Sequence, residues 1–248
     1  MSENLEQNKT DTLVASAKSI LGAVPFAGPL LSELVSNLIP NQRIDRLTKY
    51  VKELGARLSN IDGRKIDNAL SNEEGIDLLE EGFVQASRSL TDERRKFIAN
   101  VVANGINNEA IEYSESKYIL MLLQELNEQE VIWLRFFMVP TISGDEEFRN
   151  THRNILDPVP AYIGSDERTI EKASLQDSYK EHLERIGLIR SHYRIDHNTH
   201  MPEFDQFSGK PSVSYRDLTP IGRMVLKQIG FTEENDGLKG NIQCHTRA

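Results

Sequence analysis

The spacing of apolar side chains changes part-way along the chain, and this change constrains the fold more than any other feature. Up to about residue 139, apolar residues recur at intervals of three and four, with short polar joins between the runs, which is typical of successive amphipathic helices. Beyond that point, two long polar stretches and short β-type runs interrupt the helical pattern. The sequence therefore predicts a mainly α protein whose second module, beginning near residue 125, also contains strands.

The second module, residues 126–230, has the element order of a winged helix. The pattern predicts helices at 127–139 and 169–186, strands at 188–196 and 213–218, and a last helix that ends at residue 229. Asn127 and Glu130 form a capping-box pattern at the start of the first helix, and Thr219 with Pro220 suits the start of the last. We therefore expect a winged-helix-like α+β module. A polar tail, 231–248, follows it.

The first module, residues 1–125, is predicted to be a multi-helix assembly with an apolar amino-terminal hairpin at 12–39. Residues 20–31 contain no charge, and Pro25 and Pro29 interrupt them. Because proline inside a helix costs about 3 kcal/mol, the region is expected to form two short helical arms. The side chains of this hairpin that we expect at an interface are Leu21, Val24, Phe26, Leu30 and Leu31.

The length of the hairpin arms limits what the hairpin can do. An arm of about eleven helical residues spans about 16 Å, whereas the hydrocarbon core of a bilayer is about 30 Å thick. Neither arm would cross a membrane alone. Three interpretations stay open: the hairpin packs on the helices that follow it, associates with a second copy or another protein, or inserts shallowly into a membrane.

The helix predicted over residues 42–58 carries a heptad-like apolar stripe on a charged surface. Its members follow one another at alternating intervals of three and four: Ile44, Leu47, Val51, Leu54 and Leu58. A stripe of little more than two heptads suits packing against a neighbouring helix. We therefore predict a helix interface along these residues.

The charge and cysteine content exclude several classes of protein. The chain has 29 Lys and Arg against 38 Asp and Glu, a formal net charge of −9, which argues against a general nucleic-acid coat because binding to phosphates needs clustered positive charge. Cys244 is the single cysteine, which excludes a disulfide framework and a multi-cysteine metal site. The polar, acidic start is no secretion signal. We expect a cytoplasmic protein; association with a membrane on activation is one of the alternatives that the hairpin leaves open.

Motifs that would carry catalysis are missing from the sequence. The glycines at 22 and 28 lack the Lys-Ser/Thr ending of a phosphate-binding loop, and no nucleophile, acid and base can be placed together. His192, His197 and His200 fall close together near Asp196, but their spacing matches no structural zinc motif. We interpret them as part of a solvated polar wing; a metal site and a pH-sensitive or nucleic-acid contact are the alternatives. The expectation is a non-enzymatic protein without a cofactor or bound metal.

Nucleic-acid binding is the alternative that the winged-helix order suggests. Residues 185–227 contain seven basic and four acidic side chains, with Tyr193 and Tyr215 among them. The predicted backbone contacts are Arg190, Arg194 and Arg216. The acidic side chains of the helix at 169–186 oppose such binding, because carboxylates repel phosphates.

Several short segments carry a family resemblance. They are Glu93–Asn104 (ERRKFIANVVAN), Leu123–Val131 (LQELNEQEV), His182–Ile189 (HLERIGLI) and Asp217–Arg223 (DLTPIGR). In their order, over roughly residues 75–230, the chain resembles the Abi-alpha (abortive infection alpha) group of bacterial proteins, although the inserts at 140–170 and 196–211 depart from a compact version. The resemblance implies a bacterial or prophage-borne protein that acts in anti-phage defence. It supplies no catalytic residues.

The leading hypothesis from the sequence is therefore a non-enzymatic interaction or effector protein, active in abortive infection. It would act by self-association or by conditional membrane engagement of the hairpin, with another copy or a protein partner. The alternative hypothesis is a winged-helix DNA-binding regulator.

Overall fold

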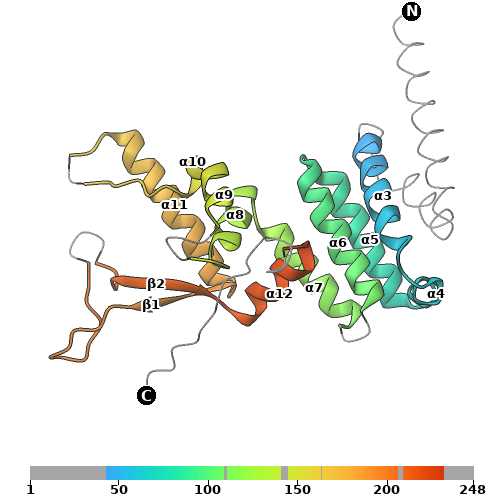
Figure 1. Cartoon of the computed structure of the whole chain (residues 1–248). Helices are drawn as coiled ribbons and strands as arrows, with labels where there is room; N and C mark the ends of the chain where they lie inside the picture. Colours follow the sequence, from blue (N-terminus) through green and yellow to red (C-terminus); the bar gives the residue numbers. More distant parts are fainter. Residues whose placement is uncertain (1–42, 109–110, 141–144, 163, 206–208, 232–248) are drawn as a thin grey trace, which may run out of the picture. The chain divides into compact units, whose positions relative to one another are not determined.

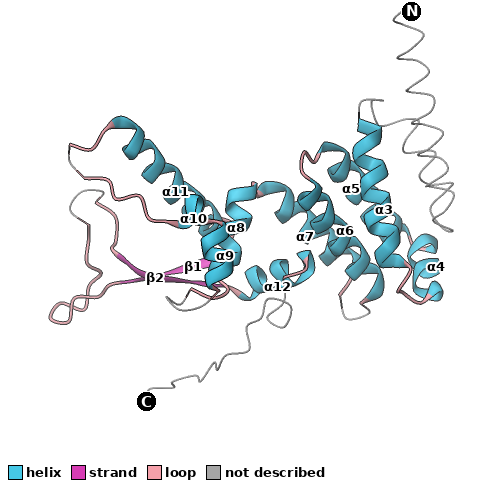
Figure 2. Ribbon diagram, turned by 45° about the horizontal axis from the view of Figure 1, so that its top comes forward, coloured by secondary structure: helices cyan, strands magenta, loops and turns pink. Residues whose placement is uncertain are grey.

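A computed structural model describes residues 43–108, 111–140, 145–162, 164–205 and 209–231. Within these ranges the chain forms ten helices and one two-stranded antiparallel sheet near the carboxyl end (Figures 1 and 2). The prediction of a mainly α protein with a small sheet in its second half is confirmed. The hairpin at 12–39, with Leu21, Val24, Phe26, Leu30 and Leu31, lies outside the described residues.

The chain divides into two compact units between Glu125 and Leu126, and Gln228–Gly230 belong to the first unit. None of the helices in the described ranges combines the length and apolar character needed to cross a bilayer.

The first unit is built from five helices around an apolar core. They are α3 (Ile44–Leu58), α4 (Gly63–Ser71), α5 (Glu73–Arg88), α6 (Asp92–Asn107) and α7 (Tyr113–Glu125). Helix α3 packs against α5 and α6, and α5 also contacts α4 and α7 (Figure 1). Tyr50 of α3 and Phe83 of α5 meet edge to face in the core, with their ring centroids 5.2 Å apart.

The apolar stripe of α3 forms part of this core. Leu47, Val51, Leu54 and Leu58 are all buried, and α3 packs on α5 and α6. The predicted stripe is therefore internal packing and offers no exposed interface, because helices of the same unit already cover it. Ile44 is the first residue of α3, and the structure does not describe its side chain.

Side-chain caps define where the helices of this unit begin. Asp62 accepts a hydrogen bond from the amide of Arg64 at the start of α4, and Asn72 accepts one from the amide of Glu74 at the start of α5. Thr91 caps α6 in the same way. Because Asn72 is extended and its side chain caps α5, α4 ends before it and a separate helix begins after it.

The second unit combines short helices, one long helix and the sheet. In order along the chain they are α8 (Glu128–Phe136), α9 (Glu146–Thr151), α10 (Arg153–Leu156), α11 (Glu167–Arg185), β1 (Ile189–Tyr193), β2 (Val213–Leu218) and α12 (Pro220–Ile229). The capping box of Asn127 and Glu130 is present at the start of α8, with both hydrogen bonds formed. At the start of α12, the hydroxyl of Thr219 accepts a hydrogen bond from the amide of Gly222 (3.1 Å). Local capping chemistry therefore sets both starts.

The sheet pairs β1 with β2 in antiparallel register, with Ile189 opposite Leu218. These two residues and Leu188 are buried, together with Leu183 of α11. Leu183 is the one buried residue of this 19-residue helix. The end of α11 contacts both α8 and β1, and the core of the second unit also contains Val131, Trp133 and Leu134 of α8.

Candidate functional site

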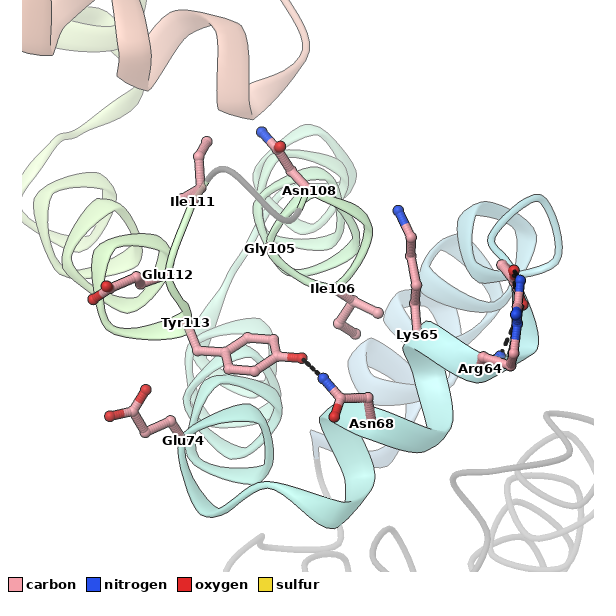
Figure 3. A pocket seen from close by; sticks show the side chains of 11 residues that line it. Arg64, Lys65, Asn68, Glu74, Gly105, Ile106, Asn108, Ile111, Glu112 and Tyr113 are labelled. Carbon is pink, nitrogen blue, oxygen red and sulfur yellow. Dashed lines mark hydrogen bonds and ion pairs between the residues drawn. The ribbon is translucent and has the colours of Figure 1, made fainter.

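An open pocket of about 780 Å³ lies in the first unit (Figure 3). Its lining carries both signs of charge, from Asp62, Arg64, Lys65, Glu74 and Glu112. Arg64 pairs with Asp62 (2.8 Å), and the Nζ of Lys65 donates to the carbonyl oxygen of Asn107 (2.6 Å). The hydrogen bonds from the Arg64 side chain and amide lower the pKa of Asp62 to about 2. Because Arg64 is already paired with Asp62 and Lys65 donates to a backbone carbonyl, these cations are engaged within the chain, and we assign no site to the pocket.

The outer face of the β1–β2 sheet brings together four polar and aromatic side chains. Arg190 and Asp217 are opposite each other in the register, as are His192 and Tyr215. The Nη2 of Arg190 lies 3.0 Å from Asp217 Oδ2, and the Nε2 of His192 lies 3.2 Å from Asp217 Oδ1. The rings of His192 and Tyr215 stack in parallel, with centroids 4.2 Å apart.

These contacts set the charge of the outer face. The hydrogen bond from Arg190 lowers the pKa of Asp217, and the contact with His192 lowers it further, against the opposing effect of burial. Asp217 is thus a carboxylate that neutralises Arg190 within the sheet. Arg190 is consequently less available to a phosphate than the sequence suggested.

The three arginines predicted to act together do not share one surface. Side chains alternate between the two faces of a strand, so Arg216 lies on the face opposite to Arg190 and Asp217. Its register partner is Ser191, which is buried and contacts Glu184 of α11. Arg194 is exposed and lies beyond the end of β1. The sequence could not show this, because the long connection between the strands leaves their register open.

The connection between β1 and β2 forms backbone hydrogen bonds within itself. Three of its residues, Arg194, Glu203 and Ser212, are joined to one another by such bonds. The amide of Arg194 donates to the carbonyl oxygen of Ser212 (2.8 Å), that of Ser212 to Glu203 (2.7 Å), and that of Glu203 to Arg194 (2.9 Å). These three bonds close a ring. The sheet, a short hairpin at 195–202 and a second bridged pair, Phe204 with Pro211, lead away from it. We call residues 193–205 and 209–215 the branched arm; Figure 1 shows it extending beyond the sheet.

The branched arm exposes apolar side chains. Five of them are more than two fifths exposed: Tyr193, Ile195, Met201, Phe204 and Tyr215. On α11, Ile170 and Leu175 are also exposed. Small hairpins are marginally stable in water by themselves, and clustered exposed apolar side chains mark interaction surfaces. The arm is therefore the candidate functional site; α11, which it meets through the Lys210–Glu181 ion pair, adds further exposed apolar side chains in the same unit.

The turn of the hairpin at 195–202 contains two of the three histidines that lie close together in the sequence, His192, His197 and His200. Asp196 Oδ1 accepts hydrogen bonds from the amides of Asn198 and Thr199 (both 2.8 Å), and these bonds lower the pKa of Asp196. His197 and His200 are exposed in this turn, whereas His192 lies on the sheet. In the described ranges, no three His, Cys, Asp or Glu side chains are grouped so that they could hold a metal ion.

The sequence reasoning missed the parts of this site that depend on pairing across the arm. Asp217, the shared partner of Arg190 and His192, and the ring at Arg194, Glu203 and Ser212 carry no local motif. The alternation of Tyr193 and Ile195 in a β-type run was a usable signal for exposed apolar side chains.

Comparisons with known proteins give no assignment: no family model, curated protein or solved structure matches this chain. The function is therefore argued from the residues and their arrangement.

Proposed function

We propose that this chain is a non-enzymatic interaction protein that associates with another copy of itself through the branched arm and α11. The observation that carries the proposal is the set of exposed apolar side chains on the arm. Aromatic side chains and methionine are enriched at protein interfaces, and the arm presents Tyr193, Met201, Phe204 and Tyr215.

The chemistry of the arm favours a protein partner over a charged polymer. Between Leu188 and Leu218 the chain has four basic side chains, Arg190, Arg194, Lys210 and Arg216, and four acidic ones, Asp196, Glu203, Asp205 and Asp217. The segment 188–218, which contains both strands and the arm, is neutral on a chain of net charge −9, so it can approach a second copy with less repulsion than the rest of the chain. This balance supports self-association.

We propose a winged-helix-like architecture for the second unit, in which the branched arm is an elaborated wing. The order α8, α11, β1, β2, α12 supports it. The biological setting proposed is anti-phage defence by abortive infection, which rests on the resemblance to the Abi-alpha group. In that setting the hairpin at 12–39 would provide a second associating surface, towards a copy of the chain or towards a membrane.

Light scattering of the full chain tests the proposal. We expect the wild type to associate at micromolar concentration and the double variant Met201→Ser/Phe204→Ser to lose this association. Phe26→Asp/Leu30→Asp, in the hairpin, reports separately on residues 12–39, and liposome flotation of the same variant reports on the membrane. A wild-type chain that stays monomeric to about 100 µM contradicts self-association.

DNA binding by the second unit is the second candidate. It is favoured by the element order and by Arg194, which is exposed beside Tyr193. Binding through phosphates would give a mobility shift at low salt that Arg190→Gln/Arg194→Gln weakens and that added salt removes. The absence of a shift at micromolar protein rejects this candidate.

A further inference from the structure

The two strands of the sheet point some of their backbone groups away from each other. In an antiparallel pair, residues that exchange hydrogen bonds with the partner strand alternate with residues whose amide and carbonyl groups point outward. The amide of Thr219 donates to the carbonyl oxygen of Leu188 (3.1 Å), which fixes this alternation along the register. The backbone groups of Ser191 in β1 and of Arg216 in β2, which lie opposite each other, therefore point outward at the two edges of the sheet.

The edge of β1 is closed by α11. Glu184 of this helix accepts hydrogen bonds from the amide of Ser191 (3.2 Å) and from its hydroxyl (2.6 Å). Helix α11 also packs on β1. Because the outward amide of Ser191 already has an acceptor within the chain, a further strand has no donor to pair with at this edge.

The edge of β2 is open. The amide of Tyr215 points to β1, so the carbonyl group of Ser214, across the same trans peptide, points outward. Among the residues that the structure describes, the amide and carbonyl groups of Arg216 and the carbonyl group of Ser214 form no hydrogen bond. An edge with unpaired backbone groups is a template for another strand.

We infer that β2 pairs antiparallel with β2 of a second copy, with the two Tyr215 residues opposite each other. In this register the amide of Arg216 in each copy donates to the carbonyl oxygen of Ser214 in the other, and the two sheets become one sheet of four strands. The inference rests on the proposed self-association and names the strand and the register through which it occurs.

The charges of β2 select this register. A pairing centred on Arg216 would place two arginines opposite each other, and one centred on Asp217 would place two aspartates opposite each other. Like charges in directly opposite positions destabilise a sheet. A pairing centred on Tyr215 avoids both contacts, because Arg216 then lies opposite Ser214.

The aromatic side chains of the outer face fit the same register. The ring of Tyr215 stacks on His192, yet Tyr215 is 57% exposed. Directly opposite Cβ atoms in an antiparallel pair lie about 5 Å apart, so a second Tyr215 would continue this stack across the joined edges. The contact buries apolar area that the single chain leaves exposed.

A proline at the open edge tests the hydrogen bonds. Arg216→Pro removes the outward amide and no bond between β1 and β2, which is the position in a sheet that tolerates proline. The matched control, Arg216→Ala, loses the same side chain and keeps the amide. In light scattering of the full chain, Arg216→Pro should lose the association of the wild type and Arg216→Ala should keep it, with circular dichroism showing that both fold. Equal association of the two folded variants overturns the inference.

Disulfide formation tests the register without a proline. In a Cys244→Ser background, which removes the single natural cysteine, Tyr215→Cys should form a disulfide-linked dimer under mild oxidation, because its two Cα atoms would lie about 4.5 Å apart. The control, Tyr193→Cys on β1, should stay monomeric on a non-reducing gel, because four strands would separate its two copies by about 14 Å.

The outcomes distinguish this inference from the proposed function. If the wild type associates but Tyr215→Cys forms no disulfide, or Tyr193→Cys forms one as readily, the pairing of β2 is overturned and self-association stands. A wild-type chain that stays monomeric in light scattering overturns both.

Discussion

The two units of this protein differ in how they treat their apolar side chains. In the first unit, α3, α5 and α6 bury their apolar faces against one another, including four members of the α3 stripe. In the second unit, α11 buries one residue along 19, and the branched arm exposes five large apolar side chains. Eight of the eleven large apolar side chains that are exposed in the described ranges belong to the second unit.

Because of this difference, the stability of the folded chain and its association with a partner should depend on different side chains. A buried side chain in the first unit has its neighbours within the same chain, so its removal leaves a cavity. An exposed apolar side chain on the arm gains little from the folded chain itself, and it gains more when a partner covers it. Substitutions in the first unit should therefore change the free energy of unfolding, and substitutions on the arm should change association.

The largest expected effect is Phe83→Ala in the core of the first unit. Phe83 is 2% exposed and packs edge to face on Tyr50, so the truncation should cost about 3–5 kcal/mol. The matched truncation on the arm, Phe204→Ala, should change the free energy of unfolding by less than about 0.5 kcal/mol. Guanidinium unfolding followed by circular dichroism measures both. Similar losses of unfolding free energy in the two variants would contradict the difference between the core of the first unit and the arm.

A glycine in the second unit tests how closely its small core is packed. A Cβ on Gly222 of α12 would clash with the backbone carbonyl of Leu188, which cannot move aside as a flexible side chain can. We expect Gly222→Ala to destabilise the second unit by about 1–3 kcal/mol. In contrast, Gly63→Ala meets open space at the start of α4 and should be tolerated. Unfolding curves of the two variants measure both effects. If the stability of Gly222→Ala equals that of the wild type, the second unit is loosely packed at this position.

The outer face of the sheet should contribute only slightly to stability. Asp217→Asn removes the carboxylate that Arg190 and His192 share, at a partly exposed position where screening keeps the loss below about 1 kcal/mol. Because folding lowers the pKa of Asp217, its contribution is present above the unfolded pKa of about 3.9 and is lost as the pH falls through the folded value. The stability difference between Asp217→Asn and the wild type should therefore shrink below about pH 4. A difference that grows on acidification would contradict the assignment.

The smallest expected effect is Tyr50→Phe. The hydroxyl of Tyr50 is buried and lacks a hydrogen-bond partner among the described residues, and burial raises the pKa of this phenol. Removing an unsatisfied buried hydroxyl should be neutral or stabilising by less than about 0.5 kcal/mol. Chemical unfolding measures the change, and a clear destabilisation would reveal an acceptor that the hydroxyl uses.

Much of the local structure could be predicted from the sequence because it depends on neighbouring residues. The capping box at Asn127, the strand at 213–218 and the start of α12 at Thr219-Pro220 are set by residues within a few positions. The α3 stripe was predicted to form a helix interface, but the spacing is the same whether a helix of the same chain or of another chain covers it.

The candidate site was less predictable because it depends on pairing between distant residues. Arg190 and His192 lie on one face of β1, and the 19-residue connection between β1 and β2 hides from the sequence that Arg216 lies on the other face. The ring at Arg194, Glu203 and Ser212 uses backbone groups, which no side-chain pattern reveals.

The most direct test of the central claim is photocrosslinking from the branched arm. A benzoylphenylalanine introduced at Phe204 of the full chain should give an adduct of twice the chain mass, in which mass spectrometry finds a peptide of a second copy. The same group at Leu90 of the first unit, which is more exposed than Phe204, should give no such adduct. Crosslinking at Leu90 and not at Phe204, or at neither under conditions where light scattering detects association, would contradict the role proposed for the arm.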